Sequence, residues 1–116
     1  MPKIEESGFQ TLPTLAIALP EEAIADFCKQ WKVEEFYLFG SILRDDFHAD
    51  SDVDVMVQFA PNARFGLFEF MDMKAALEKI CARKVDLLTK KSIEKSRNWI
   101  RRNEILGTAR LFYVAR

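Results

Sequence analysis

Three aspartates occupy positions from which their side chains could share divalent cations. Asp52 and Asp54 lie in a stretch, residues 52–59, where apolar and polar residues alternate. This alternation predicts a strand, so both carboxylates leave the same face with their Cα atoms roughly 7 Å apart. Asp86 interrupts the otherwise apolar strand predicted at residues 84–88 and is the candidate third ligand. Adjacent carboxylates repel each other, and Mg²⁺ between them would remove that penalty.

A glycine–serine bend precedes the acidic segment. Gly40 and Ser41 follow an aromatic run at residues 36–39, which predicts a buried strand that stops at the glycine. Glycine lets backbone N–H groups approach an anion, and Ser41 adds a hydroxyl where a helical turn is expected to begin. We expect this bend to bind phosphates beside the metal site. Two Mg²⁺ ions held by the carboxylates could then activate an attacking hydroxyl and a polyphosphate leaving group.

Each of these side chains also has a purely structural interpretation. Asp52 and Asp54 could form a solvated strand face, and Asp86 could be an exposed strand residue. Arg44 is equally compatible with a phosphate contact and with a surface ion pair to a nearby aspartate. His48, the single histidine, is expected to be an ordinary surface residue. The acidic pair together with the glycine–serine bend favours the functional interpretation.

The elements that position these residues can be predicted in chain order. Residues 1–19 are expected to be an N-terminal lead-in without a regular element in residues 1–12, and residues 20–116 to be the functional domain. Within it the patterns predict a helix at 20–32, strands at 36–39 and 52–59, a helix at 65–82, a strand at 84–88, a basic helix at 92–106 and a strand at 111–114. The fold class is therefore α/β or α+β, a small mixed β-sheet flanked by helices. The direction of strand pairing is left open.

Apolar spacing predicts which helix faces are buried. In the helix at 65–82, one stripe is assigned to the core: Leu67, Phe70, Met71, Leu77, Ile80 and Cys81. Trp31 and Trp99 are both expected to pack. An exposed Trp99 on the basic helix would instead indicate a docking face.

Composition limits the class of protein. The chain has 116 residues, of which 49% are hydrophobic and 30% charged, a balance typical of one globular domain. Cys28 and Cys81 match no disulfide or metal spacing, so we expect reduced thiols and a cytoplasmic protein. The apolar run at residues 15–19 is far shorter than the ~20 residues of a membrane span, so no membrane association is expected.

Charge is unevenly distributed along the chain. Residues 1–82 hold 7 basic and 15 acidic side chains, a net charge of −8, whereas residues 83–116 hold 10 and 3, a net charge of +7. The basic part could bind a polyanion or an acidic partner, or it could be a solvated helix face. Direct nucleic-acid binding is not expected, because no basic motif interleaved with aromatic residues is present.

These residues resemble the DNA polymerase β-like nucleotidyltransferase superfamily. Its signature is Gly-Ser, about ten residues, then Asp-x-Asp, and here ten residues separate Gly40-Ser41 from Asp52-Val53-Asp54. The resemblance covers roughly residues 20–116 and implies the nucleotidyltransferase fold. It also implies that Gly40, Ser41 and Arg44 bind the nucleotide, and that Asp52, Asp54 and Asp86 bind Mg²⁺ and are catalytic.

The small size is similar to that of the minimal nucleotidyltransferases of the MntA type. The resemblance implies transfer of AMP from ATP to a tyrosine of a HEPN ribonuclease toxin, with the chain acting as antitoxin in a hetero-oligomer of the type VII kind. One alternative is an antitoxin that neutralises its toxin by contact alone, suggested by Ile42 and Asp45, where relatives often carry other residues. Another is a nucleotidyltransferase for small molecules such as aminoglycosides.

Overall fold

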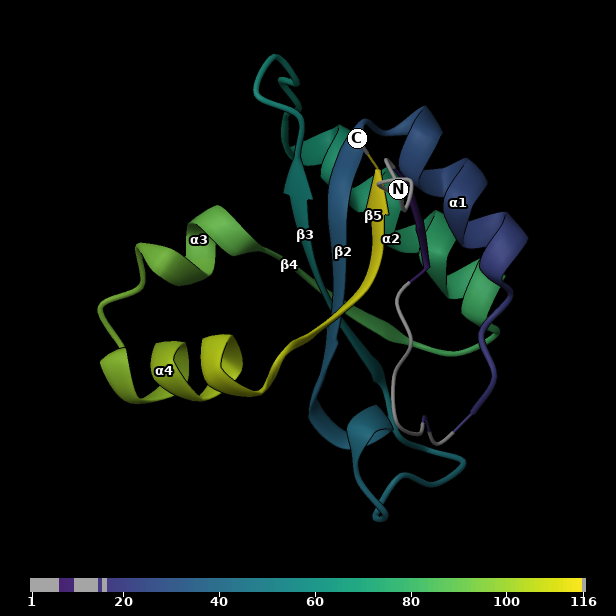
Figure 1. Ribbon diagram of the computed structural model, residues 1–116, viewed down its shortest axis with the longest axis vertical. Coiled ribbons are helices and arrows are strands. Elements are labelled where there is room, and N and C mark those ends of the chain that lie inside the picture. Colours follow the sequence, from purple (N-terminus) through teal and green to yellow (C-terminus); the bar gives the residue numbers. More distant parts are fainter. Residues whose placement is uncertain (1–6, 10–14, 16, 116) are drawn as a thin grey trace, which may run out of the picture.

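One β-sheet organises the part of the chain that the computed structural model describes, residues 7–9, 15 and 17–115 (Figure 1). In chain order the elements are β1 (Ser7–Phe9), α1 (Glu21–Gln30), β2 (Val33–Phe39), the 3₁₀ turn η1 (Gly40–Leu43), β3 (Val53–Phe59), α2 (Leu67–Cys81), β4 (Val85–Thr89), α3 (Lys90–Glu94), α4 (Trp99–Thr108) and β5 (Arg110–Ala115). The strands and helices predicted from the sequence are therefore present, except that the helix predicted at residues 92–106 is divided in two and one strand is added.

The sheet is mixed. Its strand order is β1-β5-β2-β3-β4, and every neighbouring pair is antiparallel except β3 and β4, which run parallel. A parallel pair needs a long crossover connection, and α2 supplies it. The expected mixed sheet with flanking helices is thus confirmed, and the strand directions that the sequence left open are now fixed.

The two faces of the sheet are covered differently. On one face, α1 and α2 bury the main core, in which Val53, Val55 and Val57 of β3 are almost fully buried. The opposite face is covered by α3 and α4 over a smaller cluster of Phe39, Met56, Ile93 and Ile105. Figure 1 shows these helix pairs on either side of the sheet. Because the second cluster is small, part of that face stays open.

The buried stripe of α2 differs from the predicted one. The side chains of Met73, Leu77 and Cys81 face the core, whereas Leu67 and Met71 are 71% and 56% exposed. Met73, Leu77 and Cys81 recur every four residues, so the buried face is centred on them and Met71 points away. The assignment of Leu67 and Met71 to the core was wrong.

The basic helix predicted at residues 92–106 is divided in two. α3 ends at Glu94, and α4 begins only at Trp99. The side chain of Asn98 accepts a hydrogen bond from the backbone N–H of Arg101 (3.1 Å), and the hydroxyl of Ser96 accepts one from the N–H of Asn98 (3.2 Å). Such side chains compete with the helical backbone and favour a new N-terminus. The single-helix prediction was therefore wrong, and a bend separates the two pieces.

A short edge strand lies within the predicted lead-in. β1 pairs antiparallel with β5, and the ring of Phe9 packs against Phe112 with their centroids 5.0 Å apart. The sequence analysis expected no element there, because three residues are too few to show a period. Residues 1–6, 10–14 and 16 of the lead-in lie outside the described residues. Within the described part, no helix is long and apolar enough to cross a membrane.

Candidate active site

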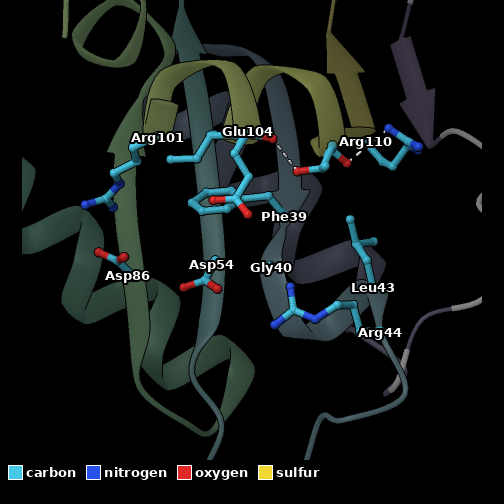
Figure 2. Close-up of a pocket in the computed structure, with 11 residues that line it drawn as sticks. Phe39, Gly40, Leu43, Arg44, Asp54, Asp86, Arg101, Glu104 and Arg110 are labelled. Carbon is cyan, nitrogen blue, oxygen red and sulfur yellow. Dashed lines mark hydrogen bonds between the residues drawn. The ribbon is translucent and has the colours of Figure 1, made fainter. Parts of the chain in front are cut away.

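Strand register brings two of the three aspartates together. β3 and β4 run in parallel with Val53 opposite Val85, so Asp54 is the direct neighbour of Asp86. Adjacent residues in register project from the same face, and neighbouring strands are about 4.8 Å apart. Figure 2 shows both carboxylates reaching into the same cavity. The predicted pairing of Asp86 with the acidic segment therefore follows from the crossover through α2.

The glycine bend lies on the other side of Asp54. Phe39, the last residue of β2, pairs with Asp54, so Gly40 begins the 3₁₀ turn beside that carboxylate. Gly40 has a φ of +77°, and a Cβ atom there would overlap the Asp54 side chain. Only glycine satisfies both the backbone conformation and the close approach. The predicted helical turn after the bend is confirmed.

The cavity between these strands and α4 has a volume of about 610 Å³. Its walls come from the end of β2, η1, β3, β4, α4 and the start of β5, and are formed by Phe39, Gly40, Leu43, Arg44, Asp54, Asp86, Arg101, Glu104, Ile105, Thr108 and Arg110. In Figure 2, Arg101 lies on the Asp86 side and Arg44 on the Gly40 side. The carboxylate pair is therefore flanked by a guanidinium on each side.

Asp54 is the most perturbed acid of the site. Burial, together with the charges of Asp86 and Asp52, raises the pKa of Asp54 from 3.8 to about 6, against the opposing charges of Arg44 and Arg101. A half-buried carboxylate that repels two others is stabilised by a divalent cation, and oxygen ligands are what Mg²⁺ prefers. The donor set therefore fits Mg²⁺, which commonly binds one or two carboxylates and completes its shell with water and substrate phosphates.

Asp52 and Ser41 lie outside the cavity wall. Asp52 precedes β3 and is exposed, and neither residue lines the cavity. Within the described part of the chain, no three Asp, Glu, His or Cys side chains are already gathered as a metal site. Asp52 is still close enough for its charge to act on Asp54. The convergence of all three carboxylates thus stays a prediction for the metal-bound protein.

Arg44 combines the two interpretations that the sequence left open. Its Nε donates to Asp46 Oδ1 at 3.2 Å, and both side chains are exposed, so the ion pair is weak. The same guanidinium lines the cavity. A phosphate contact of Arg44 stays a prediction.

Arg83 holds the loop before Asp52 and was missed by the sequence analysis. Its guanidinium donates to the backbone carbonyls of Ser51 (3.0 Å) and His48 (3.2 Å), and it lies over the ring of Phe47, 4.7 Å from the centroid. This contact ties the loop to the turn before β4. An arginine in a turn gives no sequence signal of such a role, since its partners are backbone atoms more than thirty residues away.

The α4 contribution to the cavity was also missed. Arg101, Glu104 and Thr108 recur on one face of α4 and line the cavity. From the sequence, only the basic character of this segment is evident. The helical spacing of 101, 104, 105 and 108 was visible, but which face α4 presents depends on the bend after Glu94.

Comparison with known proteins agrees with this geometry. Residues 21–111 match the nucleotidyltransferase domain family. A protein of Methanocaldococcus jannaschii named as a protein adenylyltransferase is 44% identical over 64 residues, which are 55% of this chain and 64% of that protein. The match thus spans less than two thirds of the relative's length.

Two solved structures share the fold. A toxin–antitoxin complex with AMP-PNP has a TM-score of 0.62 at 20% identity, covering 80% of this chain and 72% of that one. A tri-AMPylated HEPN toxin of Shewanella oneidensis in complex with MNT antitoxin has a TM-score of 0.54 at 17% identity, covering 78% and 66%. The family match covers most of the chain, and the glycine bend and paired aspartates lie inside it, so the chain belongs to the nucleotidyltransferase domain family.

Proposed function

We propose that this chain is a Mg²⁺-dependent protein adenylyltransferase, which transfers AMP from ATP to a hydroxyl of a partner protein. The observation that carries the proposal is the Asp54–Asp86 pair beside the Gly40 bend, in a cavity flanked by Arg44 and Arg101. The volume of about 610 Å³ lies within the range of small-ligand sites, roughly 300–1,000 Å³.

The proposed reaction is a substitution at the α-phosphorus of ATP. The acceptor hydroxyl oxygen forms a bond to that phosphorus, the bond to the bridging oxygen breaks, and pyrophosphate leaves with both electrons of that bond. Mg²⁺ held by Asp52, Asp54 and Asp86 would neutralise the polyphosphate and favour ionisation of the acceptor hydroxyl. Asp86, on the side away from Gly40, orients the hydroxyl and accepts its proton.

The remaining residues bind and orient the nucleotide. The backbone N–H groups of Gly40 and the turn after it, with the Ser41 hydroxyl, bind phosphate oxygens. Arg44 compensates the phosphate charge on the same side. Held in this way, the α-phosphorus faces the Asp54–Asp86 pair, which converts the reaction to a positioned, effectively intramolecular one.

We propose that the acceptor is a tyrosine of a HEPN toxin and that the chain is its antitoxin in the cytoplasm. Support comes from the adenylyltransferase name of the M. jannaschii relative and from the AMPylated HEPN toxin in a structure of the same fold. The two free cysteines are buried, which is compatible with a reducing compartment.

Transfer of labelled AMP tests the proposal. The chain, ATP labelled on the α-phosphate and Mg²⁺ are incubated with the product of the neighbouring gene, and label on that product is measured. Wild type is expected to transfer label and Asp54→Asn to lose it, whereas Asp26→Asn on the outer face of α1 serves as the matched control. Equal labelling by wild type and Asp54→Asn, or none by either, would contradict the assignment.

Neutralisation by contact alone is the second candidate. It is favoured by the absence of a ready-made cluster of three metal ligands among the described residues. Protection of cells that express the toxin, measured for wild type and for Asp54→Asn, distinguishes the two candidates. Protection by Asp54→Asn equal to that by wild type would show that binding is enough.

A further inference from the structure

Exposed apolar side chains gather at the starts of two helices. On α2 these are Leu67, Phe68 and Met71, and on α4 they are Trp99 (61% exposed) and Ile100 (65% exposed). Large apolar side chains this exposed and this close together mark interaction surfaces more often than isolated ones do. The packing predicted for Trp99 was therefore wrong, and the sequence-based condition for a docking face on the basic helix is met.

The surface at the start of α4 is basic as well as apolar. Residues 95–102 contain four basic and no acidic side chains, and Lys95, Arg97 and Arg101 are exposed. We define the α4 surface by these three residues with Trp99 and Ile100. Tryptophan and arginine are the side chains most enriched among those that dominate protein–protein binding. A complementary partner must present acidic groups around apolar ones.

The α4 surface is continuous with the cavity. Arg101 belongs to both, since it lines the cavity on the Asp86 side (Figure 2). Ile100 precedes Arg101 and lies one turn before Glu104, which also lines the cavity, so Ile100 stands at the rim. A protein bound to the α4 surface can therefore present a hydroxyl to the side of the site that faces away from Gly40.

The apolar cluster on α2 has the opposite electrostatic setting. Leu67, Phe68 and Met71 are interspersed with the exposed acids Glu69 and Asp72. α2 packs on the face of the sheet opposite the cavity. The α2 cluster therefore has neither the charge nor the position of the α4 surface, and it provides a matched control.

We infer that the α4 surface docks the acceptor protein through an acidic segment that also carries apolar side chains and places the acceptor hydroxyl next to Asp86. The inference rests on the proposed function and assigns the partner-binding surface of that same site. Nucleic acid is the less favoured partner, because Trp99 is the single aromatic side chain in residues 95–102 on which a base could stack.

Peptide binding tests the inference. The probe is a synthetic peptide of glutamate and leucine residues around one tyrosine, and its counterpart has lysine for every glutamate. Wild type is expected to bind the acidic peptide at least tenfold more tightly than the lysine peptide, with affinity falling as salt is added. Trp99→Ala with Ile100→Ala, and separately Arg97→Glu, should lose at least tenfold in affinity for the acidic peptide. Leu67→Ala with Phe68→Ala should bind like wild type.

Binding of an ATP analogue, measured on the same samples, separates this inference from the proposed function. Trp99 and Ile100 do not line the cavity, so the double variant should keep wild-type nucleotide affinity. Failure of wild type to bind nucleotide would refute the proposed function. Normal nucleotide binding with no preference between the peptides overturns the docking inference alone.

Two further outcomes would also overturn it. In the first, single-stranded RNA binds wild type more tightly than the acidic peptide does, and the α4 substitutions weaken this RNA binding. The surface would then be a nucleic-acid site. A wild-type oligomer in sedimentation that the α4 double variant converts to a monomer would make a second copy of the chain the occupant.

Discussion

At position 40 the backbone and a neighbouring carboxylate both exclude a side chain. The positive φ of Gly40 disfavours any L side chain, and the space where its Cβ would lie is taken by Asp54. The glycine therefore does more than form a turn. It allows the proposed phosphate-binding bend and a proposed metal ligand to occupy adjacent positions, as the proposed phosphoryl chemistry requires.

Gly40→Ala should therefore displace Asp54 as well as strain the bend. We expect AMP transfer to fall about 100-fold or more and the free energy of unfolding to drop by about 1–3 kcal/mol. The matched control is Gly107→Ala in α4, where nothing lies within 4 Å of the added methyl group. Alanine is the better helix former, so this control should be active and slightly more stable. Full transfer activity in Gly40→Ala would remove the bend from the mechanism.

Asp54 links stability to pH. Its pKa is 3.8 in the unfolded chain and about 6 in the folded one, because burial and then the charges of Asp86 and Asp52 disfavour its ionised form. A carboxyl group whose pKa is higher in the folded than in the unfolded chain lowers the free energy of unfolding once it is ionised. The free energy of unfolding should therefore fall as pH rises from about 4 to 6 and stay lower above that range.

Asp54→Asn should remove this loss of stability. Without Mg²⁺ at about pH 8, we expect the free energy of unfolding of the variant, measured by urea denaturation, to exceed that of wild type. The difference should be about 1 kcal/mol once solvent screening of the half-exposed group is allowed for. The gain should disappear below about pH 4, where wild-type Asp54 is neutral in both states. An advantage that is the same at all pH values would mean that amide packing, not charge, is its source.

At the scale of elements, the β3–α2–β4 unit assembles the acidic pair. The crossover makes β4 parallel to β3, and the register then sets Asp54 beside Asp86. Arg83 completes this unit by binding the backbone before Asp52 from the turn before β4. Loop and strand are thereby held together although more than thirty residues separate them.

Arg83→Ala should release the Asp52 loop while leaving the sheet intact. We expect transfer activity to fall about tenfold and stability to fall by about 1 kcal/mol, the usual contribution of a partly exposed charged donor. The control is Lys84→Ala at the exposed neighbouring position. If higher Mg²⁺ concentration restores the rate of Arg83→Ala, the defect is in ordering Asp52. A rate that Mg²⁺ cannot restore would contradict this role.

Elements with strong local patterns were predictable from the sequence. Alternation in β3 and helical spacing in α1 are local properties, and both elements formed where expected. Features that depend on contacts between distant residues were not predictable. The side chain of Met71 looked as apolar as that of Met73, and only the packing of α2 on the sheet decides which is buried.

The same limit applies to the site. Gly40, Asp54 and Asp86 could be named as candidates because of their spacing on predicted strands. Arg101 and Glu104 could not, because their position over the cavity depends on the bend near Asn98. That bend results from two short polar side chains whose capping role competes with helix continuation.

At the scale of the whole molecule, the cavity joins segments that lie far apart in the sequence. Its walls run from Phe39 to Arg110, so the two strands that carry Asp54 and Asp86, the 3₁₀ turn and α4 meet only in the folded state. A ligand that contacts all of them binds the folded chain and not the unfolded one. Ligand binding should therefore appear as stability.

ATP with Mg²⁺ is expected to raise the melting temperature substantially, whereas Mg²⁺ alone should raise it slightly. At a ligand concentration of about 100 times Kd the gain is about 2.7 kcal/mol. At about 4 °C per kcal/mol for a domain of this size, that gain corresponds to a shift of roughly 11 °C. Calorimetry of wild type, Asp54→Asn and the control Asp26→Asn, each with and without ligand, measures it.

The pattern across variants is more informative than the shift itself. Asp26→Asn should show the full shift. Asp54→Asn should start from a higher melting temperature and gain little, because the repulsion that Mg²⁺ relieves in wild type is already absent. An equal shift in wild type and Asp54→Asn would mean that the nucleotide and metal bind elsewhere. Asp54 is the direct neighbour of Asp86 in the sheet, so Mg²⁺ bound to phosphates beside Asp86 must also act on Asp54.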